Sequence, residues 1–255
     1  MHRDSCMLIG EAAARAGLGE MMATYVLVHG PSQGGWVFAR VAKLLRAKGH
    51  EVFTPTLTGV GERSHIKGVE VNLTLHIEDV ANVLRYEALN DVVLCGHAYS
   101  GFVITGVADH MPGRIRSLIY IDSFVPENGD SMWKHVPPAF QSMFTSSTAT
   151  HGGLRIEPVP GEVFNLNMAD REMFDARGTG MPLACFLEAI QLNGAYRTIL
   201  KKHYLYTTGW APSPFVAVGE QLKADSDWKV QPSPTGHHVM LDDPQLLADV
   251  LQGAV

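Results

Sequence analysis

The chain has 255 residues and carries 20 basic and 26 acidic side chains, which gives a formal net charge of −6 at pH 7. Its longest basic run is Lys201-Lys202, so neither nucleic acid nor an anionic membrane is an expected partner. No stretch approaches the roughly 18 successive apolar residues that a membrane span requires. This length is typical of one globular domain with a sizeable core.

The three cysteines, Cys6, Cys95 and Cys185, are scattered and odd in number, which indicates neither a disulfide framework nor a zinc site. The histidines show no metal-ligand spacing with a cysteine or a carboxylate. We therefore expect no metal and no cofactor, and a reducing cytoplasm is the simplest location. The oligomeric state is open, and a homodimer is compatible with the composition.

Residues 1–21 differ in pattern from the rest of the chain. The apolar run at 6–9 is too short for the core of a secretory signal, and Glu11 and Arg15 interrupt the next residues. Because Met22 stands directly before the first convincing strand, we predict that residues 1–21 are an N-terminal extension. The alternative is a short alanine-rich helix that docks on the domain.

From Ala23 onward, short apolar runs alternate with segments of helical spacing. The predicted strands are 25–28, 50–53, 92–95, 115–121, 203–207 and 228–231, and the predicted helices are 37–47, 75–87, 99–110, 215–224 and 243–251. Such alternation predicts an α/β domain over 22–255, with a mostly parallel six-stranded sheet and helices on both faces.

The alternation fails between about 124 and 200, a segment rich in proline and in large apolar residues. Loops this long inside a compact domain usually have a function. We predict a lid or cap over an apolar pocket, and an ordinary helical insertion with its own small core is the alternative. The lid residues expected to contact a substrate are Trp133, Phe140, Met143, Phe144 and Phe186.

The most informative stretch is Asp91-Val-Val-Leu-Cys-Gly-His-Ala-Tyr-Ser-Gly101, in which an apolar strand runs through Gly96 directly into a helix. This is the pattern of a nucleophile elbow, a strained corner that presents one central side chain. The central position is Ala98, which has no nucleophilic atom. Ser100 does not restore the pattern in a shifted frame, because Phe102 would then crowd a corner that needs small residues.

Several motifs together resemble the small α/β-hydrolases of the methylesterase and hydroxynitrile-lyase type and their bacterial esterase relatives. They are Tyr25-Val-Leu-Val-His-Gly30, Gly34-Gly35-Trp36, Pro55-Thr-Leu-Thr-Gly-Val-Gly-Glu-Arg63, the elbow, and Gly236-His-His-Val-Met240. The resemblance runs from Thr24 to the C-terminus and implies the α/β-hydrolase fold. Ala98 departs from the pattern, since this position holds a nucleophilic serine in the family.

The resemblance implies a base and an acid for a catalytic triad. His237 lies on the loop before the closing helix and fits the His-x-x-Met pattern with Met240, so it is the predicted base. Asp122 ends the strand at 115–121, the edge of the sheet where catalytic groups gather, and is the predicted acid. Glu127 and Asp130 are the alternatives, and a purely structural aspartate is a further one.

The resemblance also implies an oxyanion hole, in which backbone N–H groups hold the developing negative charge. Tyr99 can donate its N–H. Pro31 occupies the second position and has no N–H, so Ser32 is the nearest substitute. His29, His97 and His238 are grouped with the expected substrate contacts, although His29 and His97 are expected to orient backbone rather than transfer protons.

Three classes of function remain open. The first is a hydrolase of carboxylic esters, carbamates or lactones that acts on a small apolar or aromatic molecule and is inactive here because position 98 is alanine. The second is a lyase or cofactor-free oxygenase that uses a His–Asp dyad without a covalent step. The third is a ligand receptor without catalytic activity.

Overall fold

The computed structural model describes residues 22–68 and 71–255; the predicted extension at 1–21 and Cys6 lie outside the described residues. A six-stranded sheet in the order β2-β1-β3-β4-β7-β8 forms the centre, and all five strand pairs are parallel. Its strands are β1 (Thr24–Val28), β2 (Glu51–Phe53), β3 (Val92–His97), β4 (Ile115–Ile121), β7 (Lys201–Thr207) and β8 (Trp228–Ser233). The predicted fold and its six strands are confirmed.

The central strands are rich in buried apolar residues because both faces of the sheet are covered. All six residues of β3 are buried. Their side chains alternate between two core clusters, with Val92 and Leu94 in one and Val93 and Cys95 in the other. At the edge of the sheet, β8 tolerates Pro232, which has no N–H to donate to a further strand.

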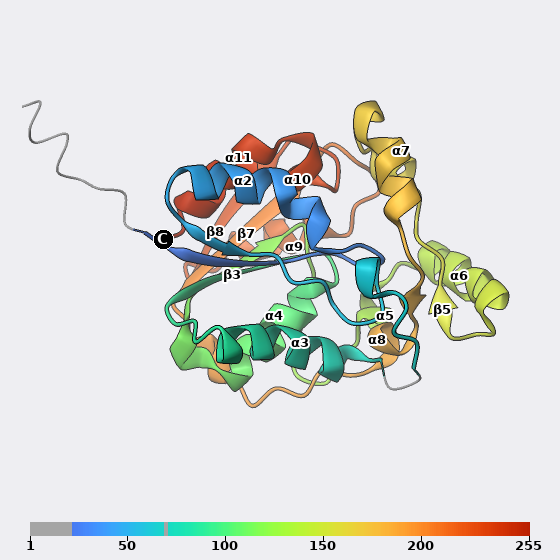
Figure 1. Ribbon diagram of the computed structural model, residues 1–255, viewed down its shortest axis with the longest axis horizontal. Helices are drawn as coiled ribbons and strands as arrows, with labels where there is room; N and C mark the ends of the chain where they lie inside the picture. Colours follow the sequence, from blue (N-terminus) through green and yellow to red (C-terminus); the bar gives the residue numbers. More distant parts are fainter. Residues whose placement is uncertain (1–21, 69–70) are drawn as a thin grey trace, which may run out of the picture.

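Helices cover both faces, with α2, α10 and α11 above the sheet and α3 and α4 below it in Figure 1. The buried hydrophobic side chains of α2, α10 and α11 belong to one core cluster, and those of α3, α4 and α9 belong to the other. The helices are α2 (Ala39–Ala47), α3 (Leu73–Tyr86), α4 (Ser100–His110), α9 (Phe215–Leu222), α10 (Val239–Asp242) and α11 (Pro244–Gln252). In the described residues, no helix is both long and apolar enough to cross a membrane.

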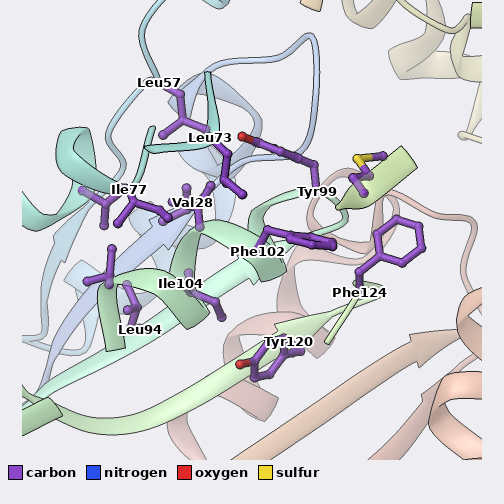
Figure 2. Close-up of a cluster of buried hydrophobic side chains, with 14 of the residues drawn as sticks. Val28, Leu57, Leu73, Ile77, Leu94, Tyr99, Phe102, Ile104, Tyr120 and Phe124 are labelled. Carbon is purple, nitrogen blue, oxygen red and sulfur yellow. The ribbon is translucent and has the colours of Figure 1, made fainter. Parts of the chain in front are cut away.

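The larger core cluster lies between the sheet and the helices α3 and α4, as Figure 2 shows. Leu94 and Tyr120 reach it from the sheet, and Phe102 and Ile104 reach it from α4. Ten of the eleven residues of α4 are buried, so this helix packs on nearly all its sides. This packing holds the start of the helix, and the corner before it, in a fixed position.

The chain between β4 and β7 forms a separate group of short elements beside the sheet, visible at the right of Figure 1. It contains α5 (Met132–His135), α6 (Pro138–Ser147), α7 (Met168–Arg177), α8 (Ala184–Leu187) and a two-stranded antiparallel ribbon of β5 (Arg155–Ile156) and β6 (Met181–Pro182). Phe144, Ile156 and Phe186 belong to the same core cluster as Phe102 of α4. The segment thus packs its apolar residues against the main domain.

Single turns of 3-10 helix complete the secondary structure. They are Gly35–Phe38, Gly61–Arg63, Pro112–Arg114, Thr148–His151, Gly161–Phe164 and Ala195–Thr198. The first of these runs directly into α2, so the helix predicted at 37–47 begins as a tighter turn.

Candidate active site

The corner between β3 and α4 is strained at Ala98. Its φ of 52° lies in the left-handed region, which is uncommon for residues other than glycine. The backbone around it is crowded: a Cβ on Gly96 would lie 2.5 Å from the Ser100 oxygen, and one on Gly101 would lie 1.9 Å from the Phe124 oxygen. The corner therefore has the form of a nucleophile elbow, with a methyl group at its apex.

Ser100 turns away from the cavity that Ala98 lines. Its side chain is fully buried and donates a hydrogen bond to the carbonyl oxygen of His29. The hydroxyl thereby joins the start of α4 to the end of β1. The buried location of the Ser100 side chain agrees with the prediction that Ser100 does not replace the missing nucleophile.

His237 follows β8 and reaches the same corner from another part of the sheet edge. Its Nδ1 atom lies 2.6 Å from Oδ2 of Asp122, and its backbone N–H donates to the carbonyl oxygen of Phe164 over 3.1 Å. The ring of Phe215 stacks on the imidazole, with 5.4 Å between the centroids and planes 6° apart. These contacts hold the ring in place, and its Nε2 atom has no hydrogen-bond partner among the described residues.

Asp122 is fully buried at the carboxyl end of β4. Besides His237, three donors hold its carboxylate: the Thr207 N–H at 2.8 Å, the Thr207 hydroxyl at 2.7 Å and the Trp210 indole N–H at 3.0 Å. A buried carboxylate needs such partners because burial without them is costly. The sequence analysis did not identify Thr207 and Trp210 as partners of Asp122. The signal that could have found them is their position at the end of β7 and just after it.

The two alternative acids lie elsewhere. Glu127 pairs with Arg197 on the surface, and Asp130 accepts from the Glu127 N–H at 3.0 Å and contacts His135 at 3.1 Å. Neither contacts His237. Asp122 is the carboxylate that the structure brings to the imidazole.

The residues expected to form an oxyanion hole lie around Ala98. Pro31 and Ser32 line the cavity, and the φ of Ser32 is 63°. The carbonyl of Ser32 accepts from the Thr179 N–H at 2.9 Å, which ties this loop to the segment after α7. Tyr99 contributes only backbone to the corner, because its side chain is buried and its hydroxyl contacts Nδ1 of His76 at 3.0 Å.

A largely apolar cavity opens above Ala98 and His237 and encloses about 830 Å³, part of it open to solvent. Of the predicted contacts, Phe140, Phe144, Phe186 and His238 line it. Sequence reasoning missed other lining residues, which come from several loops: Gln33, Phe124, Met132, Val136, Ile156, Glu157, Val159, Phe164, Phe174, Met181, Trp210 and Phe215.

Four of the predicted substrate contacts lie outside the cavity wall, which corrects their placement. His29 accepts from the Leu57 N–H at 3.0 Å, and His97 donates to the carbonyl of His237 at 3.0 Å. Trp133 packs against the main core cluster, and Met143 is 38% exposed on the flank of α6. Both histidines hydrogen-bond to backbone groups, which agrees with the expectation that they orient backbone rather than transfer protons.

Three of the histidines around the site are held in the neutral form. Burial lowers the pKa of His29 to about 4. Burial also lowers the pKa of His97 and of His238 well below the usual range, and the nearby imidazole of His237 adds to both shifts. In residues 22–68 and 71–255, no three His, Cys, Asp or Glu side chains are arranged to hold a metal ion.

Comparison with known proteins places this geometry in a family. The chain is 41% identical over 239 residues to a carbendazim hydrolyzing esterase from a Nocardioides species, an alignment that covers 90% of the chain and 98% of that protein. It is 30% identical over 144 residues to Methylesterase 2 of Arabidopsis thaliana, covering 52% of the chain and 49% of the relative.

A solved structure shows the same fold. It is an extracellular alpha/beta-hydrolase from a Paenibacillus species, with a TM-score of 0.79 and 24% sequence identity over 91% of this chain and 98% of that one. Residues 25–250 also match the sequence profile described as the alpha/beta hydrolase family. The chain therefore belongs to the alpha/beta hydrolase family.

Proposed function

We propose that this protein is built to hydrolyse small neutral esters or carbamates with an apolar or aromatic part, and that Ala98 withholds the covalent step. The observation that carries the proposal is the 2.6 Å contact between His237 and Asp122 beside a strained corner at position 98. The similarity to an esterase that hydrolyses carbendazim supports the reaction class.

The proposed reaction requires a serine at position 98, as in the variant Ala98→Ser: the serine hydroxyl attacks the ester carbonyl while Nε2 of His237 takes its proton. Asp122 holds the imidazole in the required tautomer through Nδ1 and stabilises its charge. The Tyr99 N–H and Ser32 hold the oxyanion. His237 then returns the proton to the leaving alcohol, and water, activated by the same imidazole, releases the acid from the enzyme.

The cavity indicates the kind of substrate. Aromatic and aliphatic side chains line most of it, which favours a small apolar or aromatic molecule with few polar groups. The segment between β4 and β7 contributes Phe140, Phe144 and Phe186 to this wall. It serves as the lid that excludes water from the reacting carbonyl.

The methyl side chain of Ala98 favours a second function, that of a lyase or a cofactor-free oxygenase. Without a nucleophile at position 98, the His237–Asp122 pair still offers a base beside an apolar cavity. Proton abstraction from a bound substrate, as in a lyase or a cofactor-free oxygenase, requires no covalent intermediate. The loss of one oxyanion donor at Pro31 agrees with such chemistry as well.

The substitution Ala98→Ser separates the two. Loss of a triad nucleophile costs about 10⁶ in turnover in a serine hydrolase. We expect Ala98→Ser to hydrolyse a p-nitrophenyl or methyl aryl ester, where the parent chain shows almost no turnover, and to be labelled by a fluorophosphonate. Ala98→Gly, which also lacks an oxygen, is the matched control and should remain inert. A serine variant that neither turns over esters, carbamates and lactones nor takes the label excludes the hydrolase.

A further inference from the structure

The side chain of Tyr99 has no role in the reaction described above, although its backbone N–H is the predicted donor to the oxyanion. The side chain is fully buried and belongs to the main core cluster of Figure 2 rather than to the cavity wall. Its hydroxyl lies 3.0 Å from Nδ1 of His76, and the two rings meet edge-on with 5.7 Å between their centroids. This contact links the residue after Ala98 to helix α3.

The direction of this hydrogen bond follows from the second nitrogen of the ring. Nε2 of His76 lies 2.8 Å from the carbonyl oxygen of Thr58, which can only accept, so Nε2 carries a proton. His76 is fully buried, and burial lowers its pKa, so the imidazole is neutral and carries no second proton. Nδ1 is therefore an acceptor, and the Tyr99 hydroxyl donates to it.

The carbonyl group that holds His76 is itself fixed in place. The Thr58 N–H donates to Oδ2 of Asp79 over 2.6 Å, and the Thr58 hydroxyl donates to Oδ1 over 2.9 Å. Asp79 and His76 both belong to α3, so the helix holds this loop and the loop holds the imidazole. The Tyr99 hydroxyl is thus tied to a helix and a loop of the main domain.

The peptide group between Ala98 and Tyr99 is held from its other end as well. Three donors reach the carbonyl oxygen of Ala98: the Ser123 hydroxyl at 2.7 Å, the Gly101 N–H at 3.2 Å and the Phe124 N–H at 3.4 Å. In a trans peptide the N–H points opposite to the carbonyl, so the Tyr99 N–H points away from these donors. It has no hydrogen-bond partner among the described residues, and Ala98 beside it lines the cavity.

We propose that the hydrogen bond between the side chains of Tyr99 and His76 positions the Tyr99 N–H for the oxyanion. The peptide plane is set by both of its ends: the donors to Ala98 fix the carbonyl, and the anchored phenol fixes the Cα of Tyr99. This N–H carries more of the charge stabilisation here because Pro31 supplies no donor. The inference rests on the proposed hydrolase and makes Tyr99 and His76 positioning residues of its oxyanion hole.

The test uses the Ala98→Ser background, in which Tyr99→Phe removes only the hydroxyl oxygen. Single-turnover kinetics on p-nitrophenyl benzoate separate the acylation rate constant from the substrate dissociation constant. Loss of a whole oxyanion donor costs about 10²–10³ in rate, so we expect a misdirected donor to slow acylation at least about tenfold. Substrate binding should stay within about twofold, because the oxyanion forms only in the transition state.

A second readout distinguishes the oxyanion hole from a general loss of packing. The same rates are measured on the thiono ester, in which sulfur replaces the carbonyl oxygen. A sulfur anion accepts weaker hydrogen bonds than an oxygen anion and therefore gains less from the Tyr99 N–H. We expect Tyr99→Phe to slow the oxygen ester more than the thiono ester, which lowers the ratio of the two rates.

Variants at His76 test the same hydrogen bond from its other side. His76→Leu should reproduce the loss, and His76→Asn, whose amide oxygen can replace Nδ1, should restore most of it. The double variant Tyr99→Phe, His76→Leu should cost no more than either single change, because both break one bond. Circular dichroism establishes folding, and if His76→Leu does not fold, Tyr99→Phe and His76→Asn still give the comparison.

Tyr120→Phe is the matched control. Tyr120 is also a buried tyrosine of the main core cluster, and its hydroxyl contacts the Thr105 hydroxyl at 2.7 Å without reaching the corner. Its removal should lower Tm and leave the acylation rate and the oxygen-to-sulfur ratio unchanged.

The positioning role is overturned if Tyr99→Phe behaves like Tyr120→Phe, or if it slows both esters equally. Either result would mean that the Tyr99 hydroxyl supports only the core, while an active Ala98→Ser variant leaves the hydrolase intact. An inert Ala98→Ser variant is seen before any change at Tyr99. It would overturn the hydrolase, and the positioning role with it.

Discussion

At the scale of single residues, the apex of the strained corner between β3 and α4 carries only the methyl group of Ala98. Ala98 keeps a φ of 52°, although alanine gains nothing from the strain. Gly96 and Gly101 allow the backbone to pack so closely around this corner that a Cβ at either position would lie 2.5 Å or less from a backbone oxygen. The corner thus belongs to the fold, and the chemistry depends on what the corner carries.

In the proposed reaction, His237 depends on its contact with Asp122. In the Ala98→Ser background, we expect Asp122→Asn to lower kcat by about 10⁴, because an amide stabilises the wrong tautomer of His237. Glu127→Gln, which alters a surface ion pair with Arg197, should leave kcat unchanged. Steady-state kinetics on a p-nitrophenyl ester measure both. Equal rates in Ala98→Ser and in the double variant Ala98→Ser, Asp122→Asn would contradict the assignment.

Buried neutral histidines make stability depend on pH. His29 has its pKa lowered to about 4, so the unfolded chain binds a proton between about pH 6.5 and 4 that the folded chain refuses. Stability from this group is complete above pH 6.5 and is lost as pH falls towards 4. We expect His29→Gln to flatten the fall in the free energy of unfolding over this window, as measured by urea titration.

The control for this experiment is His110→Gln, at an exposed histidine on the last turn of α4. It should leave the pH dependence of the parent unchanged. An identical slope in the parent and His29→Gln would show that the loss of stability below pH 6.5 comes from other groups.

At the scale of elements, the approach of α4 to the end of β4 fixes the corner. A Cβ on Gly101 would lie 1.9 Å from the backbone oxygen of Phe124, which cannot move without moving the strand end. The helix and strand are therefore locked at a distance that only glycine permits. Asp122 lies two residues before Phe124, so the same contact places the acid.

We expect Gly101→Ala to lower the free energy of unfolding by about 1–3 kcal/mol or more, the usual cost of overpacking. Gly113→Ala is the matched control, because nothing lies within 4 Å of a Cβ added there. It should cause no loss of stability and a gain of up to about 1 kcal/mol, since alanine reduces the freedom of the unfolded chain. Chemical denaturation of both variants is the measurement, and equal stabilities would contradict the close approach.

At the scale of the whole molecule, the segment between β4 and β7 contributes side chains both to the main core cluster and to the wall of the cavity. Phe140 and Trp133, seven residues before it, both pack against the main core cluster, but of the two only Phe140 also lines the cavity. In the Ala98→Ser background, Phe140→Ala should change the ratio of kcat/KM between an aromatic and a short alkyl ester with little change in Tm.

Trp133→Ala should do the reverse, lowering Tm with an unchanged substrate ratio, because it removes packing without touching the cavity. Together the two variants test whether this segment acts as a lid. A change of preference in Trp133→Ala, or none in Phe140→Ala, would contradict the placement of these side chains.

The sequence by itself determined the parts of this protein that depend on local pattern and chain order. Alternating apolar runs and helical spacing predicted the six strands, and the run into Gly96 predicted the corner at Ala98. The resemblance to the α/β-hydrolases, together with the order of elements, pointed to Asp122 at a strand end and to His237 on the last loop. The strands and the corner are set by neighbours within a few residues, which is why periodicity reveals them.

Only the tertiary structure decided which side chains share the cavity. Gln33, Phe164 and Trp210 line it from three separate loops, and no spacing in the sequence relates them. The same holds for Thr207, whose two hydrogen bonds to Asp122 span 85 residues. His29 and His97 were expected at the substrate but are committed to backbone partners. Irregular loops carry no period, so their side chains are placed by the packing of the folded chain.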